Sequence, residues 1–554
     1  MFSPLWLNTV AFFLRVVRST PVAHAQVKRT DAFNQENGCR QTEVAILGAG
    51  VAGVIAAKIL SDSGHSDFVI IEANDDIGGR LAPIAFGQDG NGSQYIVERG
   101  ANWVHGTSAN GGPENPIFQL ANKHNLTNHV SNFLSLSLYD GAGPIVDREY
   151  FEEFEAAWHN VEYEAGRLLS TQSEDRSMRA ALRKAGWDNR GDPLRVATEW
   201  FAMDWELAST AEETSQLFGT INFNSTWYQY SEDNLFVLDQ RGYVEFLRGE
   251  AREFLGENLD DDRLLLSHRV LNINHTDPDA KINIRTSGDE NQYACFEADH
   301  VINTFSLGVL QHDMSTMFVP ELPEWKTTAI NTMTMGIYTK IFLQFPPEKV
   351  FWDKSKEFFL YASDQRGRYP AFQSLDHADF HPGSGILFVT VVGDESIRVD
   401  QLDDDQVKAE VMDVLRQMFG DEIPDPTDFY FPRWSTTDWA YGSYSNVPPG
   451  MSLKQHQNVR ANVDRIWFAG EHTSTNYFGF LHGAYFEGKI VGETLAARLD
   501  GDEEGGKDYV FYEEVKGTQP DEYDEDNGWL YDSLKQPQAG MRGRRMKRSI
   551  ASLP

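Results

Sequence analysis

The first folded stretch of the chain alternates short apolar runs with glycines and polar breaks. Residues 44–47 (VAIL) form an apolar run that leads directly into a glycine-rich turn, and residues 51–60 have the apolar spacing of a helix. Residues 68–71 (FVII) form a second apolar run, which ends at Glu72. Strand, helix and strand within about 30 residues have the size of a βαβ unit. The pattern therefore predicts such a unit beginning near Thr42.

Further along, the pattern predicts a mixed middle region and a second junction from strand through loop to helix. The predicted helices are residues 152–184, 200–207 and 403–419, and the predicted strands are residues 337–345, 386–392 and 465–469. A last helix is expected to run to about Leu499. Beyond Asp500 acidic residues dominate and aliphatic residues are few, which predicts an extended or disordered tail. Its basic end, residues 542–548, is either solvated or a processing site.

Composition and charge say more about the kind of partner than they say about the fold. The chain has 554 residues, 41% of them hydrophobic, which suggests two domains or one elaborate domain. The net charge is -35, and such an acidic surface disfavours nucleic acid as a partner. The same charge either keeps the protein in solution or steers a cationic substrate toward an acidic cleft. No interior run reaches the roughly 18 apolar residues needed to span a bilayer.

The amino terminus and the cysteines give weaker information about the compartment. Residues 2–17 are mostly apolar, and the sequence Ala-His-Ala at 23–25 fits a signal cleavage site, so secretion is expected. No basic residue precedes the apolar stretch, which leaves a short anchor or a cytoplasmic location as the alternative. The sequence contains four glycosylation sequons, at Asn91, Asn125, Asn224 and Asn274.

Cys39 and Cys295 are too few for a disulfide scaffold or a cysteine zinc site, and they form either one disulfide or two thiols. No metal site is expected.

A nucleotide-binding motif lies in the predicted βαβ unit. Gly48, Gly50 and Gly53 form the pattern G-x-G-x-x-G between the first strand and the helix. These glycines allow a tight turn, the approach of a pyrophosphate and close packing of the helix on the strand. Glu72 follows 19 residues after Gly53, where its carboxylate can hold ribose hydroxyls. Arg80, in Gly-Gly-Arg at 78–80, is placed to meet a pyrophosphate and favours FAD over NAD, whereas Glu72 argues against NADP.

Several further motifs carry a resemblance to a known family. They are GANWVHG at 100–106, DQRGY at 239–243, YTKIF at 338–342, FAGEHT at 468–473 and HGAY at 482–485. With the glycine turn and Gly-Gly-Arg, this set resembles the flavin-containing amine oxidases, and especially the polyamine oxidases. The resemblance extends from Thr42 to about Leu499, which is nearly all of the predicted fold.

The resemblance implies an α/β fold (α+β overall) in which a discontinuous Rossmann-like FAD-binding domain meets a substrate domain made of a sheet and helices. The implied pieces are residues 1–25 for a signal peptide, 42–130, 239–310 and 441–499 for the FAD-binding domain, 131–238 and 311–440 for the substrate domain, and 500–554 for the tail. The implied FAD contacts, beyond the glycine turn, Glu72 and Arg80, are Ala101, Asn102, Trp103, Val270, Gly470, Glu471 and Leu481. The alternative for Trp103 is an ordinary core tryptophan. No cysteine lies near residues 442–473, where monoamine oxidases attach flavin, so FAD is expected to be non-covalent.

Lys340 and His105 are the residues implied in chemistry. Lys340 interrupts an apolar strand, where burial would lower the pKa of its ammonium group. The matching lysine in the family holds a water against the flavin, whereas the alternative is a lysine at a strand edge that reaches solvent. His105 occupies a position that faces the substrate in polyamine oxidases, and a histidine there is similar to the animal and yeast members. The alternative is a structural, hydrogen-bonded histidine.

Five residues are candidates for substrate binding. Glu206 and Asp233 offer carboxylates for amine groups, and Tyr338 is expected to line the same cavity. Val447 and Phe480 depart from the family, because several relatives have tryptophan and tyrosine at these positions. The aromatic walls around the substrate are therefore expected to be partly rebuilt, which leaves the identity of the amine open.

The sequence thus predicts an FAD-dependent polyamine oxidase acting on spermine- or spermidine-type amines. Hydride-equivalent transfer to the flavin would give an imine, which hydrolyses to an aldehyde and a shorter amine, while oxygen is reduced to hydrogen peroxide. Another flavin amine oxidase, acting on an amino acid or a pathway-specific amine, is the first alternative. A non-catalytic FAD-binding interaction protein or a chromatin demethylase is the second, although no additional binding module is visible.

Overall fold

A parallel βαβ unit opens the described part of the chain. In the computed structural model, β1 (Arg40–Leu47) pairs parallel with β2 (Phe68–Ile71), and α1 (Val51–Asp62) connects them, as the sequence predicts. The structure describes residues 38–108, 112–145, 149–171, 173–288, 293–513 and 515, so the predicted signal peptide and the basic end lie outside it.

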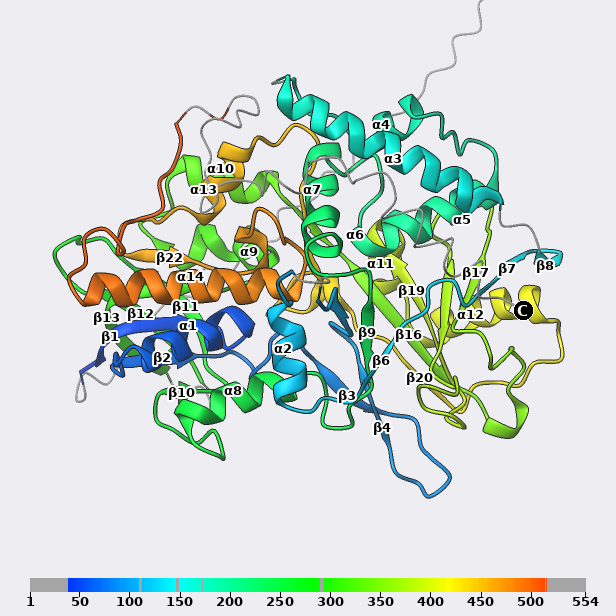
Figure 1. Cartoon of the computed structure of the whole chain (residues 1–554). Coiled ribbons are helices and arrows are strands. Elements are labelled where there is room, and N and C mark those ends of the chain that lie inside the picture. The colour runs from blue at the N-terminus through cyan, green and yellow to red at the C-terminus, as the bar shows by residue number, and fades with distance from the viewer. Residues whose placement is uncertain are drawn as a thin grey trace, which may run out of the picture. The chain divides into compact units, whose positions relative to one another are not determined.

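The βαβ unit belongs to an eight-stranded sheet assembled from three distant parts of the chain. The order is β10-β2-β1-β13-β12-β11-β14, and β22 also pairs with β13. The bounds are β10 Leu264–Leu265, β11 Arg269–Asn274, β12 Ile282–Ser287, β13 Tyr293–Asn303, β14 Phe318–Val319 and β22 Ile466–Phe468. The last helix, α14 (Leu481–Leu499), lies alongside α1 (Figure 1). A Cβ on Gly488 would come within 2.3 Å of the Ala52 carbonyl oxygen, so this close approach requires glycine.

A second, seven-stranded sheet carries the other predicted strands. Its order is β20-β16-β19-β18-β17-β7-β8. The bounds are β7 Leu136–Asp140, β8 Gly143–Ile145, β16 Tyr338–Gln344, β17 Phe358–Tyr361, β18 Ala371–Ser374, β19 Ile386–Val392 and β20 Asp428–Tyr430. Every residue of β16 and β19 is buried, and α12 (Asp404–Phe419) packs its apolar side against this sheet.

The described residues also form three small sheets and further helices. The small sheets are β5-β9-β6 (Trp103–His105, Asn234–Val237, Asn128–Val130), β3-β4 (Pro83–Phe86, Tyr95–Glu98) and β15-β21 (Thr334–Gly336, Tyr444–Asn446). The helices are α2 Pro116–Lys123, α3 Glu149–Ser170, α4 Met178–Lys184, α5 Pro193–Glu199, α6 Trp205–Leu207, α7 Gln216–Trp227, α8 Glu245–Leu255, α9 Leu307–Met317, α10 Glu324–Thr332, α11 Gly393–Asp400 and α13 Leu453–Arg460. Within the part of the chain that the structure describes, no helix is both long and apolar enough to cross a bilayer.

The two large sheets take their strands from alternating segments of the chain, and two strand pairings cross the boundaries expected for the domain pieces. β14 pairs with β11, so the eight-stranded sheet extends past the expected end at residue 310. β9 pairs with both β5 and β6, so the three-stranded sheet crosses the expected boundary between residues 130 and 131. Both differences arise from strand pairing between distant segments, which local patterning does not report.

The first part of the region after Asp500, which is expected to be extended or disordered, contacts the rest of the structure without forming a helix or strand. Tyr512 exchanges backbone hydrogen bonds with the side chain of Asn458 (2.7 and 2.9 Å), and the ring of Phe511 stacks on Trp325 at 4.6 Å. Tyr509 lies under the guanidinium of Arg460. Three aromatic residues therefore anchor this segment, which its composition does not predict.

The two cysteines form a disulfide between Cys39 and Cys295, which resolves the alternative left open by the sequence. It joins the residue just before β1 to β13, in the same eight-stranded sheet. Both thiols are thereby removed from any reaction with a cofactor.

Candidate functional site

One cavity is lined by residues from both large sheets and contains most of the predicted site. Its predicted lining residues are Gly48, Gly50, Glu72, Arg80, Ala101, Asn102, Trp103, His105, Glu206, Val270, Tyr338, Lys340, Gly470, Glu471, Phe480 and Leu481. Gly53, Asp233 and Val447 do not line it. The glycine turn after β1 forms one end, and Tyr338 of β16 with Glu206 forms another part of the wall.

The glycine turn is shaped by three different requirements. Gly48 has a φ of +106°, and a Cβ there would lie 2.6 Å from Oγ1 of Thr304. A Cβ on Gly53 would meet the Gly48 carbonyl oxygen at 2.0 Å, so Gly53 acts through helix–strand packing, as the motif predicts. A Cβ on Gly50 would meet no atom within 4 Å, because this residue faces the cavity. α1 begins here without a side-chain cap, which leaves its first amides available to an anion.

Glu72 closes the glycine turn from β2. Its Oε2 accepts a hydrogen bond from the Ala49 amide (2.7 Å), and its Oε1 accepts from the amide and side chain of Asn74 (2.9 and 2.8 Å). Burial raises the pKa of the Glu72 carboxyl, although these hydrogen bonds oppose the shift. The carboxylate lies at the end of a buried strand and borders the cavity, where the motif predicts a ribose contact.

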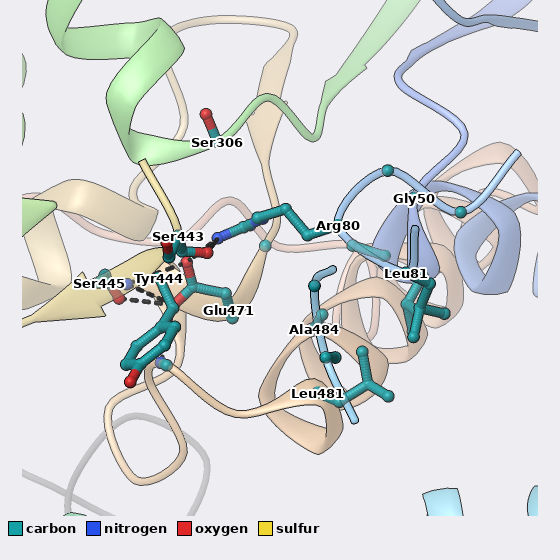
Figure 2. Close-up of a pocket in the computed structure, with 18 of the residues that line it drawn as sticks. Gly50, Arg80, Leu81, Ser306, Ser443, Tyr444, Ser445, Glu471, Leu481 and Ala484 are labelled. Carbon is teal, nitrogen blue, oxygen red and sulfur yellow. Dashed lines mark hydrogen bonds and ion pairs between the residues drawn. The ribbon is translucent and has the colours of Figure 1, made fainter. Parts of the chain in front are cut away.

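Arg80 and Glu471 form an ion pair that joins three segments of the cavity wall (Figure 2). Nη1 of Arg80 donates to Oε1 of Glu471 (2.7 Å) and to the Ser443 carbonyl (2.9 Å). Glu471 also accepts from the Ser445 hydroxyl (2.5 Å) and from the Gly479 amide (2.7 Å). Burial alone would raise the pKa of the Glu471 carboxyl, but the charge of Arg80 and these donors lower it. Arg80 thus borders the cavity in an ion pair with a buried carboxylate.

Lys340 is buried in an interior strand, which excludes the alternative of a strand-edge lysine in solvent. Its Nζ donates to the carbonyls of Glu98 (2.7 Å) and Gly100 (2.8 Å) and to Oδ1 of Asn102 (2.9 Å). Three acceptors match the three N–H groups that only the ammonium form possesses. Burial lowers the pKa of Lys340, and the nearby Glu98 carboxylate opposes this shift.

His105 and Glu206 approach each other across the cavity, beside an aromatic wall. Nε2 of His105 lies 3.7 Å from Oε1 of Glu206, and the rings of His105 and Phe480 are 5.0 Å apart. Burial lowers the pKa of His105 to about 4, so the ring is neutral near pH 7. A carboxylate beside a neutral imidazole is a suitable place for an ammonium group.

Tyr444 is a lining residue that the sequence analysis missed. It lies on β21, its hydroxyl donates to the Glu206 carbonyl (2.9 Å), and its ring is 6.0 Å from that of Tyr338. The sequence offers one indication of this position, because Tyr444 lies two residues before Asn446 and close to Val447, a candidate substrate residue. Tyr444 and Phe480 both line the cavity, so it has aromatic walls in spite of the departures at Val447 and Phe480.

Two predicted substrate residues are in the wrong place for that role. Val447 is fully buried in the core beneath the eight-stranded sheet, and its carbonyl accepts from the Ser215 amide (2.9 Å). β21 ends just before it, and Val447 does not line the cavity. Asp233 is exposed in the turn that precedes β9, where its carbonyl accepts from the Gly106 amide (2.9 Å).

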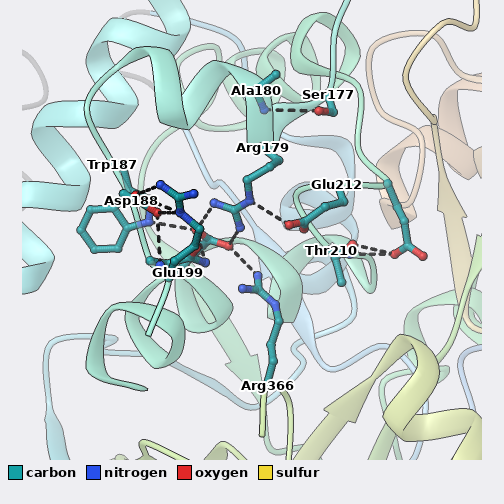
Figure 3. A network of polar contacts seen from close by, with 12 residues as sticks. Ser177, Arg179, Ala180, Trp187, Asp188, Glu199, Thr210, Glu212 and Arg366 are labelled. Carbon is teal, nitrogen blue, oxygen red and sulfur yellow. Dashed lines mark hydrogen bonds and ion pairs between the residues drawn. The ribbon is translucent and has the colours of Figure 1, made fainter. Parts of the chain in front are cut away.

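A buried ionic cluster supports the segment that carries Glu206 (Figure 3). Arg179 and Arg366 both bind the carboxylate of Glu199, which has no exposed surface. Arg366 also donates two hydrogen bonds to the carboxylate of Asp204, from Nε to Oδ2 (2.8 Å) and from Nη2 to Oδ1 (2.7 Å). Asp204 is the last residue of a π-helical turn at Trp200–Asp204. Because Glu206 follows two residues later, this cluster fixes how the segment enters the cavity.

Comparison with known proteins places the chain in a family. Residues 51–495 match the family described as flavin containing amine oxidoreductase, and the chain belongs to this family. It is 37% identical over 497 residues to polyamine oxidase 7 of Oryza sativa subsp. japonica, covering 87% of this chain and 98% of that protein. It is also 37% identical over 469 residues to polyamine oxidase 1 of Zea mays, covering 82% and 90%. Both relatives are plant proteins, although His105 taken alone is similar to animal and yeast members.

The fold is shared with solved structures of lower sequence similarity. The structure of putrescine oxidase bound to putrescine superposes with a TM-score of 0.62 at 17% identity, covering 83% of this chain and 99% of that chain. At this identity the likeness concerns the fold. It is a mixed α/β architecture with a Rossmann-like FAD domain, as the sequence predicts.

Membership of the family implies FAD, and the residues present fit this cofactor. The uncapped start of α1 and the open space at Gly50 suit a pyrophosphate, and Glu72 lies where a ribose would reach it. Nε1 of Trp103 is buried and has no hydrogen-bond acceptor among the described residues, so it can serve a bound group. Val270 and Leu481 border the same cavity.

Proposed function

We propose that this enzyme oxidises a polyamine with oxygen as the electron acceptor. The observation that carries the proposal is the Glu206 carboxylate, which lies 3.7 Å from Nε2 of His105 in a cavity that is also lined by the rings of Tyr444 and Phe480. A remote ammonium group of a polyamine would meet this carboxylate, while its apolar methylene segments would contact Tyr444 and Phe480. The similarity to plant polyamine oxidases over most of the chain supports the same substrate class.

The chain's own residues would position the amine and control its charge. FAD, when bound, supplies the group that accepts a hydride equivalent from the carbon beside the nitrogen and passes electrons to oxygen. His105 is neutral near pH 7, so it can accept a hydrogen bond from an ammonium group without repelling it. Lys340 lines the cavity beside Trp103, where three acceptors hold its ammonium form and its neutral form would have a lone pair to offer a bound molecule.

Anaerobic reduction of the bound flavin tests the proposal. The purified yellow protein is mixed with spermine, spermidine, their acetylated forms or L-amino acids, and the flavin absorbance is followed. Rapid bleaching by a polyamine supports the proposal, and product analysis then gives the cleaved bond. Bleaching by an amino acid alone would overturn the substrate class, and no bleaching with FAD bound would favour a non-catalytic role.

FAD attachment is proposed to be non-covalent. Both cysteines are joined in the disulfide and neither lines the cavity, so a thioether to the flavin has no thiol available. Acid precipitation should release the flavin into the supernatant. Flavin that stays with the precipitated protein would contradict this.

We also propose that the protein passes through the secretory pathway. The Cys39–Cys295 disulfide suits an oxidising compartment, and three sequon asparagines (Asn91, Asn125 and Asn274) are exposed, whereas Asn224 is buried in α7. Expression in a secreting host followed by glycosidase treatment should lower the apparent mass. An unmodified protein retained in the cytoplasm would contradict the proposal.

A further inference from the structure

Glu98 belongs to the segment that holds Lys340, and its carboxylate has an unusual environment. It is the last residue of β4, and its backbone carbonyl is one of the three acceptors of Lys340. Its side chain is only 5% exposed and does not line the cavity. Oε1 accepts a hydrogen bond from the Tyr243 amide (2.6 Å), whereas Oε2 is buried and has no hydrogen-bond partner among the described residues.

Three cations act electrostatically on this carboxylate. They are Lys340 on β16, Arg248 on α8 and the adjacent Arg99, and Tyr243 lies in the turn before α8. Arg248 is already bound to Asp76 and to a backbone carbonyl. Lys340, in contrast, has three neutral acceptors, and Glu98 is the one ionisable group that raises its pKa.

Glu98 and Lys340 each stabilise the charged form of the other. A buried carboxylate or ammonium group tends to become neutral when it is isolated, because burial penalises the charged form. Lys340 is held by the backbone carbonyl of the same residue that carries this buried, partly unsatisfied carboxylate, so the two charges interact across the protein interior without direct contact and each stabilises the other.

We propose that Glu98 is the counter-ion of Lys340 and a positioning residue that determines whether Lys340 is protonated. The ammonium form has three N–H groups for its three acceptors, so it is fully engaged by the protein. The neutral form has two N–H groups and a lone pair, which frees one acceptor and lets Lys340 bond another molecule in the cavity. Glu98 thus controls the protonation of Lys340. The protonated side chain is held by its three acceptors, whereas the neutral side chain can bond another molecule.

A double-mutant cycle tests the pairing without any substrate. Glu98→Gln, Lys340→Met and the double variant are compared by thermal unfolding of the FAD-loaded proteins at pH 7. Glu98→Gln should lower the Tm in the wild-type background, because the ammonium group loses its counter-ion. In the Lys340→Met background the same change should leave the Tm unchanged or raise it. Equal Tm losses in both backgrounds would overturn the proposal.

The pH dependence of flavin reoxidation gives a second measurement. The flavin is reduced with dithionite and mixed with oxygen over a range of pH, so this test does not need the proposed amine substrate. If Lys340 governs the rate, Glu98→Gln should move the midpoint downward by about one pH unit or more. The kinetic role of Lys340 rests on the proposed function, whereas the double-mutant cycle is independent of it.

Glu357→Gln is the matched control. Glu357 is equally buried and accepts hydrogen bonds from the Asn132 amide (2.6 Å) and the Gln373 side chain (3.0 Å), but it does not line the cavity or contact Lys340. Its replacement should leave the midpoint of reoxidation unchanged, whatever it does to the Tm. An equal shift of the midpoint in both variants would overturn the specific role of Glu98.

Discussion

Among the residues that the structure describes, two lysines are buried, and they have different surroundings. Lys340, on β16, lines the cavity, binds three neutral acceptors and interacts with the charge of Glu98. Lys326, on α10, does not line the cavity and has no exposed surface. Its Nζ donates to the carbonyls of Val459 (2.6 Å) and Ala461 (2.7 Å) and lies 3.5 Å above the ring of Phe468.

The acceptors show what each lysine does. Val459 lies in the last turn of α13 and Ala461 follows its end, so Lys326 satisfies carbonyls that have no partner within the helix. Lys340 instead gathers the segment from Glu98 to Asn102 at the wall of the cavity. Burial of a lysine therefore does not by itself indicate catalysis. Contact with a cavity and a buried counter-ion distinguish Lys340 from Lys326.

Replacement of Lys340 by Met should have the largest effect. We expect turnover and flavin reoxidation to fall by about 100-fold or more, as when a positioned proton-transfer group is lost. FAD should stay bound, because the glycine turn, Glu72 and Arg80 are unaffected. The measurements are stopped-flow reoxidation and the ratio of flavin to protein absorbance. Unchanged turnover would remove Lys340 from the mechanism and with it the contrast between the two lysines.

Replacement of Lys326 by Met should reduce stability and leave the chemistry intact. Two buried carbonyls would lose their donor, so we expect a loss of about 2–4 kcal/mol in the free energy of unfolding. Turnover per bound flavin should stay within a factor of about two, since such a change lies outside the site. Denaturant unfolding and turnover of the same preparation measure both quantities. A large fall in turnover per flavin would show that Lys326 also affects the reaction.

The sequence predicts one of these lysines and not the other, for a physical reason. Lys340 interrupts an apolar run, YTKIF, so its burial is visible in local pattern. Lys326 lies in the polar helix EWKTTAINT, and its burial arises from contact with α13, more than 100 residues later. The glycine turn, Glu72 and Arg80 were likewise found because their motif is local. The Cys39–Cys295 pairing and the cavity position of Tyr444 depend on segments brought together only by the fold.

The smallest expected difference between the two lysines is in how their contribution to the free energy of unfolding changes with pH. Burial lowers the pKa of Lys326 well below its usual range, and no nearby acid opposes this shift. In the unfolded chain the pKa of a lysine is about 10.4, so between the two values the unfolded state binds more protons. Wild-type stability relative to Lys326→Met should therefore rise from pH 7.5 to pH 10, by at most about 1.4 kcal/mol per pH unit.

Lys340→Met is the comparison for this measurement. Glu98 opposes the lowering of the pKa of Lys340 and leaves it at about 7, so the difference in stability between wild type and Lys340→Met should rise with pH above that value and level off below it. Denaturant unfolding of the three proteins at several pH values measures both slopes. A flat difference for Lys326→Met would mean that Lys326 stays protonated in the fold, with its third N–H directed at the ring of Phe468. In that case an aromatic face, and not only a carboxylate, is sufficient to hold a buried ammonium group in this protein.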